Sequence, residues 1–463
     1  MRTCASSTPS IVPITPAVRS WWVPDMRRLR VSDSRRFLAH EDGRPFFYLG
    51  DTAWELFHRL NREEADLYLE DRAAKRFTVI QAVVLAERNG LVDPNPYGHL
   101  PLRDNDPRKC NEPYFRHIDT IVEKAAQLGL VIGMLPTWGD KWNQKWGVGP
   151  EIFNPDNAYA FGHWLGKRYA EAPIIWILGG DRPVETPEHR DIVSMMARGL
   201  REGDGGTHLA SFHPSGGHTS VDYWPDSDWL DFHMLQSGHR RNQDNYGVIA
   251  ADYARTPTKP CMDAEPAYED HPSGFDLNNG YLDDYDVRKG LYWALFAGAC
   301  GHTYGCHDIW QMWQQGRDPA TFARTPWQQA LHLPGSAQVQ HARALLESRP
   351  YFSRIPDQTL IVSDVGEGTH HVQATRDAGG GYAMIYLSSC KPVTVDLEKL
   401  SGEMLDVTWY DPRTGEARRG GQVARRGRQT FTPPTVWPDW VLVLDDAAQG
   451  YPVAGTVAFA FHD

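Results

Sequence analysis

The chain has 463 residues, which is more than one hydrophobic core usually serves, so two domains are expected. Its apolar fraction of 41% and charged fraction of 23% are typical of a soluble globular protein. The net charge of −12 argues against nucleic acid and against an anionic membrane surface as partners, because both attract basic proteins.

Short apolar runs alternate with amphipathic stretches from residue 36 onward, whereas residues 1–35 show no regular pattern. The amphipathic stretches at 61–76, 112–129 and 157–172 predict helices, since their apolar residues recur at helical spacing. They separate four apolar runs that predict strands at 46–54, 77–85, 130–138 and 174–178. Strands that alternate with helices in this way are typical of a parallel sheet.

Four further strands are expected in the next part of the chain. They lie at 208–214, 230–238, 259–266 and 301–307, and a helix at 283–299 separates the last two. Eight strand–helix units predict a protein of the α/β class with a (β/α)8 barrel over residues 36–345. A doubly wound sheet is the alternative. It usually carries a Gly-rich phosphate fingerprint after its first strand, and GDTAWE is not one.

The pattern changes after residue 345. Apolar and polar residues now alternate in short runs that Gly, Pro and Asp separate, as in EMLDVTWYDPRTG and DWVLVLDD. This pattern predicts an antiparallel β-sandwich over residues 346–463. The expected organisation is therefore an irregular segment (1–35), a catalytic barrel (36–345) and a C-terminal β-sandwich domain (346–463).

The cysteines and the N-terminus give little sign of export. The six cysteines are scattered and form no CxxC motif, so they are expected to be free thiols: Cys4, Cys110, Cys261, Cys300, Cys306 and Cys390. The first twenty residues contain no apolar run of the length that a secretory signal needs, which favours a cytoplasmic location. No stretch approaches the roughly 18 apolar residues of a membrane span, so no membrane partner is expected.

Two carboxylates follow predicted strands at positions where barrel enzymes carry their chemistry. Asp181 follows the fourth strand in PIIWILGGDRP, and Glu265 follows the seventh in KPCMDAEP. These strand ends lie across the mouth of a barrel, so the two side chains could flank one bond. Cleavage of a glycoside needs such a pair, one to protonate the leaving oxygen and one to attack or to activate water. For Asp181 the alternative is a helix cap.

Aromatic and polar residues at the other strand ends are candidates for binding a sugar. The chain has seventeen Trp and nineteen Tyr, whose rings suit the apolar faces of sugars, although Trp is also a frequent core residue. The candidates are Asp51, Trp54, Gln81, Trp138, His213, His233, Gln236, Asp263 and Tyr304. Three alternatives stay open here: a helix N-cap for Asp51, rim packing for Trp54, and an arginine partner for Asp263.

A metal site is the alternative interpretation of the eighth strand end. His302, His307 and Asp308 cluster there, but their spacing resembles no dedicated metal site. The sequence therefore predicts no metal and no cofactor.

Several stretches resemble the apiosidase-like domain of glycoside hydrolase family 140. They are FLAHEDGRPFFYLGDTAWELFHRLNREEADLYLEDRAAKRFTVIQA, MLPTWGDKW, WILGGDRP and RKGLYWALFAGACGHTYGCHDIW, spread over about residues 35–340. The resemblance implies a retaining mechanism with an Asp acid/base and a Glu nucleophile, which are Asp181 in GGDRP and Glu265 in DAEP. The tail, with WYDPRTG and DWVLVLD, is similar to a small β-domain named for collagen binding, which we expect to support the barrel instead.

The expected function is that of a retaining glycoside hydrolase with a carbohydrate substrate. The resemblance implies a β-apiosidase that releases apiose from plant polysaccharides or plant glycosides. One alternative is a glycosidase of the same type that acts on another furanoside or pyranoside, such as an arabinoside. An alternative from another class is a non-catalytic carbohydrate-binding protein, although such a protein has no need of both carboxylates. The oligomeric state stays open.

Overall fold

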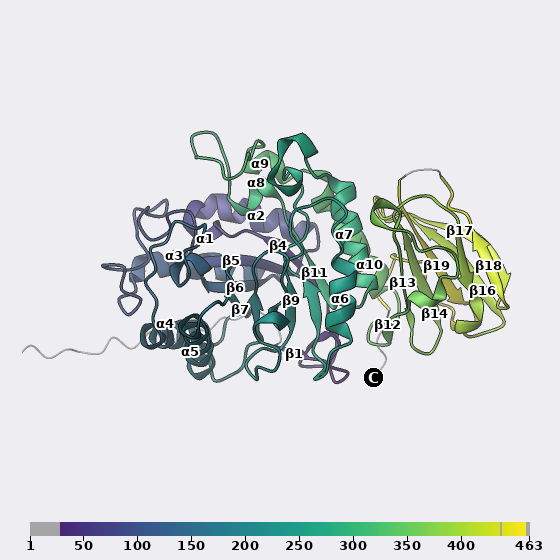
Figure 1. Ribbon diagram of the computed structural model, residues 1–463, viewed down its shortest axis with the longest axis horizontal. Coiled ribbons are helices and arrows are strands. Elements are labelled where there is room, and N and C mark those ends of the chain that lie inside the picture. Colours follow the sequence, from purple (N-terminus) through teal and green to yellow (C-terminus); the bar gives the residue numbers. More distant parts are fainter. Residues whose placement is uncertain (1–27, 436–437, 460–463) are drawn as a thin grey trace, which may run out of the picture.

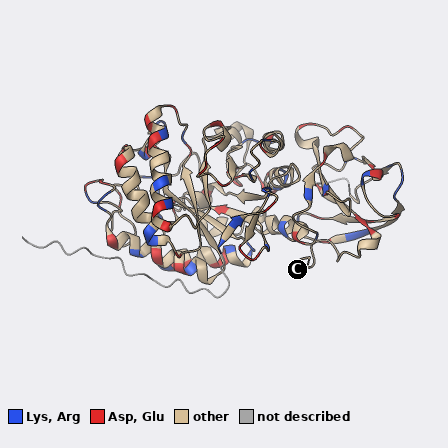
Figure 2. Cartoon of the chain, turned by 90° about the horizontal axis from the view of Figure 1, so that it is seen from below, with Lys and Arg blue, Asp and Glu red and all other residues tan. Residues whose placement is uncertain are grey.

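The computed structural model describes residues 28–435 and 438–459, which form a helix-covered barrel and a smaller β-domain beside it (Figure 1). Charged residues are concentrated on the outer helices and loops, whereas the inner strands contain few of them (Figure 2). None of the helices in this described part is long and apolar enough to cross a membrane. Five cysteines within it are free thiols, as predicted, and Cys4 lies outside the described residues.

The eight-stranded sheet is the predicted barrel. Its strands pair in parallel in the order β8-β7-β6-β5-β4-β11-β10-β9. The strands are β4 (Tyr48–Thr52), β5 (Val79–Leu85), β6 (Val131–Thr137), β7 (Ile174–Gly179), β8 (Ala210–His213), β9 (His233–Leu235), β10 (Cys261–Asp263) and β11 (Gly301–Tyr304). Each lies within or next to a run predicted as a strand, which confirms the (β/α)8 architecture.

Helices cover the outside of the barrel. They are α1 (Leu56–Arg59), α2 (Arg62–Ala74), α3 (Glu112–Gln127), α4 (Pro155–Tyr169), α5 (Pro187–Asp204), α6 (Asn245–Tyr253), α7 (Asp284–Phe296), α8 (His307–Trp310), α9 (Trp327–Ala330) and α10 (Pro334–Glu347). Three of the longer ones begin at capping boxes, with Asn61, Asn154 and Asp283 as the N-caps. These side chains bond backbone N–H groups that the first helical turn leaves without partners.

The barrel closes between β8 and β9 without a regular ladder. The Asp231 backbone N–H donates to the Ala210 carbonyl (2.8 Å), and the Ala210 N–H donates to the Asp231 carboxylate (2.8 Å). The Ser211 hydroxyl then donates to the Phe232 carbonyl (2.7 Å). Side chains therefore supply part of the hydrogen bonding that backbone groups supply at the other strand pairs.

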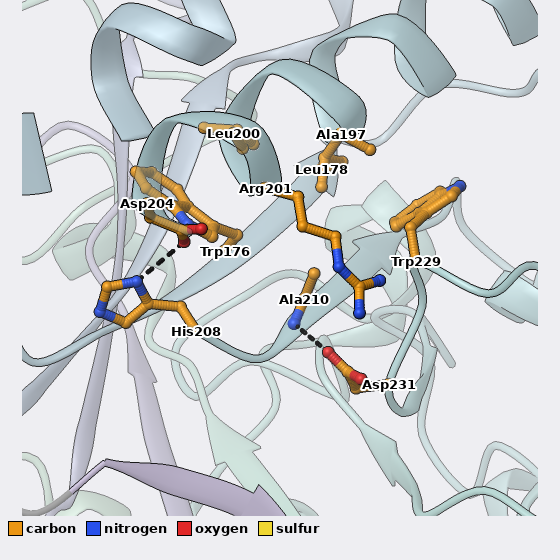
Figure 3. Close-up of a pocket in the computed structure, with 10 residues that line it drawn as sticks. All are labelled: Trp176, Leu178, Ala197, Leu200, Arg201, Asp204, His208, Ala210, Trp229 and Asp231. Atoms are coloured by element: carbon orange, nitrogen blue, oxygen red, sulfur yellow. Dashed lines mark hydrogen bonds and ion pairs between the residues drawn. The ribbon is translucent and has the colours of Figure 1, made fainter. Parts of the chain in front are cut away.

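A small cavity lies outside this closure, between β7, β8 and α5 (Figure 3). Asp204 and His208 are hydrogen-bonded at one end of it (2.9 Å), and Asp231 accepts its bond from Ala210 at the other. Its volume is about 10 Å³, roughly the space of one water molecule. We therefore assign it to packing and not to ligand binding.

A short antiparallel sheet precedes the barrel and was not predicted. Its strands are β1 (Leu29–Val31), β2 (Leu38–His40) and β3 (Pro45–Phe46). The predicted irregular segment, residues 1–35, therefore contains a strand, and its residues 1–27 lie outside the described residues. The β1 strand is three residues long and only partly buried, which is too short for a recognisable alternation.

The C-terminal domain is antiparallel, as predicted. A six-stranded sheet has the order β12-β13-β14-β19-β16-β17, and a two-stranded sheet pairs β15 with β18. The strands are β12 (Arg354–Pro356), β13 (Val372–Asp377), β14 (Tyr382–Leu387), β15 (Val393–Asp396), β16 (Met404–Tyr410), β17 (Ala417–Ala424), β18 (Arg428–Phe431) and β19 (Trp440–Asp446). One face of the larger sheet packs in the barrel core and the other in a core of its own.

A buried ion pair joins the two domains. Arg288 of α7 donates to both carboxylate oxygens of Asp439, at 3.0 Å each. The Tyr386 hydroxyl donates to the same carboxylate (2.9 Å), and the Tyr386 ring stacks on Tyr292 of α7 with 4.8 Å between ring centroids. The Arg288 side chain is 2% exposed and that of Asp439 is 0% exposed, so neither charge can be solvated if its partner is lost.

We expect Asp439→Ala to destabilise the protein by about 3 kcal/mol, because Arg288 loses its fully buried carboxylate partner and keeps Asp284, whose side chain is 28% exposed. Urea denaturation gives the free energy of unfolding. The control is Glu416→Ala, which breaks an ion pair with Arg418 whose side chains are 58% and 45% exposed. That change should lower the free energy of unfolding by less than about 1 kcal/mol. Equal losses in the two variants would contradict the importance of the buried pair.

Candidate active site

A cavity of about 760 Å³ opens at the carboxyl ends of the barrel strands. Every strand of the barrel is followed by at least one residue that lines it. In strand order from β4 to β11, these residues include Trp54, Glu87, Trp138, Asp181, Ser215, Gln236, Glu265 and His307. The barrel therefore brings together side chains that are far apart in the sequence, as its parallel topology requires.

Asp181 reaches the cavity through a sharp turn at the end of β7. Gly179, Gly180 and Asp181 all have positive φ angles, of 97°, 94° and 57°. A Cβ atom on Gly179 would lie 2.2 Å from the His213 carbonyl oxygen, so only glycine fits there. Asp181 itself adopts a left-handed conformation that is uncommon for residues other than glycine and that clusters at functional sites.

The Asp181 carboxyl is 20% exposed and accepts two hydrogen bonds through Oδ2. The donors are the Trp146 indole N–H (3.0 Å) and the Arg182 guanidinium (3.0 Å). Burial raises the pKa of Asp181, and the nearby negative charge of Glu265 raises it further, while Arg182 and Trp146 act in the opposite direction. The net shift is upward, so Asp181 holds its proton to a higher pH than an exposed aspartate does.

A third carboxyl, Glu87, shares Arg182 with Asp181. The buried Arg182 guanidinium donates to Glu87 Oε1 (3.1 Å) as well as to Asp181. Burial raises the pKa of Glu87 to about 7, with further increases from Asp140 and Asp181 and an opposing effect of Arg182. Arg182 thus holds two acidic side chains of the cavity wall in fixed positions.

Glu265 stands in a different electrostatic environment. Its Oε1 accepts hydrogen bonds from Gln236 Nε2 (3.0 Å) and His239 Nε2 (3.1 Å), and its Oε2 lies 3.0 Å from His213 Nε2. Burial alone would raise the pKa of Glu265, but these two histidines outweigh burial and lower it. Of the two carboxyls, Glu265 is therefore the one that ionises first, and Asp181 the one that holds its proton to higher pH.

The two oxygens of the Glu265 carboxylate differ in their hydrogen bonding. Within residues 28–435 and 438–459, Oε2 has no aligned hydrogen-bond donor, since the His213 ring is close but not directed at it. His239 is fixed from both sides, because its Nδ1 lies 2.9 Å from the Pro266 carbonyl oxygen and its Nε2 faces Glu265. The ring can donate to both acceptors only when both nitrogens carry hydrogen, that is, as a cation.

Three of the nine predicted substrate-binding residues line this cavity: Trp54, Trp138 and Gln236. The two indoles are only 3% and 4% exposed. They pack against each other with ring centroids 5.1 Å apart, and both contact the His213 ring. His213 is fully buried, so it reaches the site only through Glu265.

Asp51 and Tyr304 do not line the cavity, which corrects their assignment to substrate binding. Asp51 accepts hydrogen bonds from Tyr68 (2.6 Å) and Arg72 on α2, and it is fully buried. Tyr304 lies beside it in the neighbouring strand and donates to Glu269 (2.6 Å). Side chains alternate along a strand, and both of these point out of the barrel toward the helices.

Gln81, His233 and Asp263 are also buried away from the cavity. Gln81 points into the barrel and donates to the Thr303 hydroxyl (2.8 Å), and His233 contacts the Ser220 hydroxyl (3.2 Å). Asp263 does not line the cavity, and among the described residues it does not pair with the arginine that was its alternative partner. It accepts hydrogen bonds from the Ser237 hydroxyl (2.7 Å) and the Asn245 amide (2.9 Å), while burial raises its pKa to about 6.

Several residues of the site were not among the predicted ones, among them Glu87, Trp146 and His239. Glu87 follows β5 by two residues and could have been found from its strand end. Trp146 and His239 lie in loops several residues beyond β6 and β9, where the strand pattern gives no signal. In the described part of the chain, no group of three or more His, Cys, Asp or Glu side chains is arranged to hold a metal ion.

Known families match both domains of the chain. The family described as "Apiosidase-like, catalytic domain" matches residues 32–353, and the family described as "Putative collagen-binding domain of a collagenase" matches residues 355–445. None of the curated proteins matches the chain.

Two solved structures are similar over nearly the whole chain. One is that of a glycoside hydrolase family 5 protein from Bacteroides vulgatus, with 34% identity and a TM-score of 0.86 over 94% of this chain and 97% of that one. The other is titled a glycoside hydrolase, with 35% identity and a TM-score of 0.83 over 91% of this chain and 98% of that one.

We expect Glu265→Gln to lower the pKa of Asp181, because it removes a nearby negative charge that favours the protonated form. Titration of the aspartate carboxyl carbons by NMR measures this, with Asp181→Asn to assign the signal. Glu185→Gln is the control, since Glu185 also lines the cavity but pairs with Lys145 (2.6 Å). The same shift in both variants would show that Glu265 has no particular influence on Asp181.

Proposed function

Because the chain belongs to the apiosidase-like family and is a glycoside hydrolase, we propose that it is a retaining β-apiosidase of the family 140 type, with Asp181 as acid/base and Glu265 as nucleophile. The substrate we propose is a plant polysaccharide or plant glycoside that carries β-linked apiose. The match to the apiosidase-like family supports apiose as the sugar, and the chemistry of the cavity supports the two catalytic roles.

The observation that carries this proposal is the contrast between two carboxyls in one cavity. Asp181 has a raised pKa and Glu265 a lowered one, and the charge of Glu265 is itself a cause of the shift at Asp181. Retaining glycosidases need this division, because one carboxyl must donate a proton while the other must be an anion. The surroundings of each residue support its role: a buried position near an anion for Asp181, and two histidines for Glu265.

In the first step, Glu265 attacks the anomeric carbon as the glycosidic bond breaks. Its Oε2 is the oxygen without an aligned donor, so it is the one we assign to the attack, while Gln236 and His239 hold Oε1. Asp181 gives its proton to the leaving oxygen at the same time. The step yields a glycosyl ester on Glu265, an ionised Asp181 and the released alcohol.

In the second step, the ionised Asp181 takes a proton from a water molecule, which attacks the anomeric carbon and breaks the ester bond to Glu265. Glu265 leaves as a carboxylate and Asp181 is protonated again. The hydrogen bonds from Arg182 and Trp146 favour the ionised form of Asp181. They therefore keep Asp181 from becoming too weak an acid in the first step, at the cost of some basicity in the second.

The main experiment compares the hydrolysis of para-nitrophenyl β-D-apioside by the wild type, Asp181→Ala and Glu265→Ala. We expect kcat to fall by about a hundredfold or more in both variants, because Glu265→Ala removes the nucleophile and Asp181→Ala removes the base that activates water in the second step. Parallel reactions contain the arabinofuranoside, the galactoside and the glucoside. The control is Asp222→Ala, since Asp222 is a partly exposed acid that pairs with His218 and does not line the cavity.

The outcomes separate the parts of the proposal. Turnover of the apioside alone, lost in both variants, supports the sugar and the catalytic pair together. Turnover of another sugar with the same two losses keeps the pair and rejects apiose. Turnover that survives both substitutions rejects the pair. Product NMR at early times tests retention, since the β-anomer must form first.

We expect His239→Ala to move the acid limb of the kcat/KM profile to higher pH by about one unit. The acid limb reflects Glu265, which must be ionised to attack. The His239 hydrogen bond lowers the pKa of Glu265, so its loss raises that pKa and activity disappears at a higher pH on acidification.

His218→Ala is the matched control for this pH profile. His218 also lines the cavity, but it is half-exposed and pairs with Asp222 (3.0 Å) instead of Glu265. Its replacement should leave the acid limb in place. An unchanged acid limb in His239→Ala would mean that His239 does not set the charge state of the nucleophile.

A further inference from the structure

Trp146 lies in the loop of residues 142–150, which a buried ion pair anchors. Lys141 and Asp140 are both fully buried and 2.9 Å apart. Asp140 accepts the Gly149 N–H (2.8 Å), and Lys141 donates to the Gly149 carbonyl (3.0 Å). These bonds join the two ends of the loop to each other, and Trp146 lies between those ends.

The Trp146 ring is held on one face and one edge. The Arg182 guanidinium carbon lies 4.6 Å from the centre of the ring, and the indole N–H donates to Asp181 Oδ2 (3.0 Å). Arg182 is in turn fixed by Asp181 and Glu87. These contacts orient the ring, yet Trp146 is 62% exposed and lines the cavity, so much of its apolar surface faces the solvent of the cavity.

An oriented and exposed indole at an active site suits a ligand with a flat apolar face. Among the described residues, two large apolar side chains line this cavity and are more than half exposed, Trp146 and Phe275. They belong to different sides of the site. Trp146 is bonded to Asp181, whereas Phe275 contacts the rings of His239 (5.8 Å) and His271 (4.7 Å) on the side of Glu265.

The position of Trp146 decides which part of a substrate it contacts. The acid/base residue donates its proton to the glycosidic oxygen, so the group that leaves with this oxygen lies beside Asp181. The sugar that becomes bound to the enzyme lies over Glu265. A ring bonded to Asp181 is therefore next to the leaving group.

We propose that Trp146 is the binding platform for the leaving group, and that the natural leaving group presents a flat apolar face, either the C–H face of a pyranose or an aromatic ring. This inference rests on the proposed roles of Asp181 and Glu265. It makes Trp146 a specificity-determining residue. Because one indole contacts the leaving group with its face and Asp181 with its N–H, it also places the leaving oxygen close to the acid that protonates it.

The experiment measures kcat/KM for methyl, glucosyl and phenyl β-apiosides in the wild type, Trp146→Ala, Trp146→Phe and Phe275→Ala. Methyl and glucosyl leaving groups are both alcohols that need protonation, so their ratio reports binding of the leaving group and not acid strength. We expect the glucosyl-to-methyl ratio to fall about tenfold in Trp146→Ala, as expected for loss of a ring contact. The phenyl compound tells whether an aromatic ring is bound equally well.

The two other variants separate the platform from general effects. Trp146→Phe keeps a flat ring, so it should keep the ratio. It also loses the N–H that stabilises the ionised Asp181, so the pKa of Asp181 rises and the alkaline limb moves to higher pH. Phe275→Ala should lower kcat/KM for all three compounds alike, since Phe275 lies on the other side. Melting temperatures confirm that each variant is folded, and Trp146 is exposed enough for its loss to be tolerated.

A glucosyl-to-methyl ratio that is unchanged in Trp146→Ala would overturn the platform. So would an equal fall of the ratio in Phe275→Ala, because the effect would then not depend on the side of Asp181. Failure of the proposed function looks different, since it appears as turnover of another sugar or as activity that survives Asp181→Ala. In either case the same three leaving groups on the sugar that is cleaved still decide the role of Trp146.

Discussion

The charge of Arg182 lies buried beneath the cavity, and the site depends on how this charge is neutralised. A guanidinium without water around it needs carboxylates, and here it has Asp181 and Glu87, with the Trp146 ring against its plane. These three partners come from the loops after β7, β5 and β6. One cation therefore connects three loops, and the proposed acid is one of the groups it holds in place.

Burial alone would raise the pKa of both carboxyls of the proposed pair, so their opposite pKa shifts must have another cause. The difference comes from their neighbours. Two imidazoles stand against Glu265, whereas Asp181 has Arg182 on one side and the Glu265 anion on the other. The contrast is self-reinforcing, because each electrostatic contact that ionises Glu265 also strengthens the field that keeps the proton on Asp181.

Much of the fold and part of the site could be predicted from the sequence. Each barrel strand is an apolar run with a polar end, and this pattern identified all eight, together with Asp181 and Glu265 in the cavity. The direction of a side chain could not be predicted where a strand is buried on both faces. β4 is buried throughout, so nothing in its sequence shows that Asp51 points outward to Arg72. Trp146 and His239 were missed because loop paths depend on tertiary contacts.

The joint between the barrel and the β-domain has a consequence for how such chains can evolve. Helix α7 supplies Arg288 and Tyr292 to the interface, and the apolar core of the barrel continues onto one face of the β-domain sheet. The β-domain is therefore not a detachable appendage that recombination could exchange for another module. A new partner domain would have to supply both a buried acid for Arg288 and an apolar face for α7. Inheritance of the barrel and the β-domain as one unit therefore requires the fewest simultaneous changes.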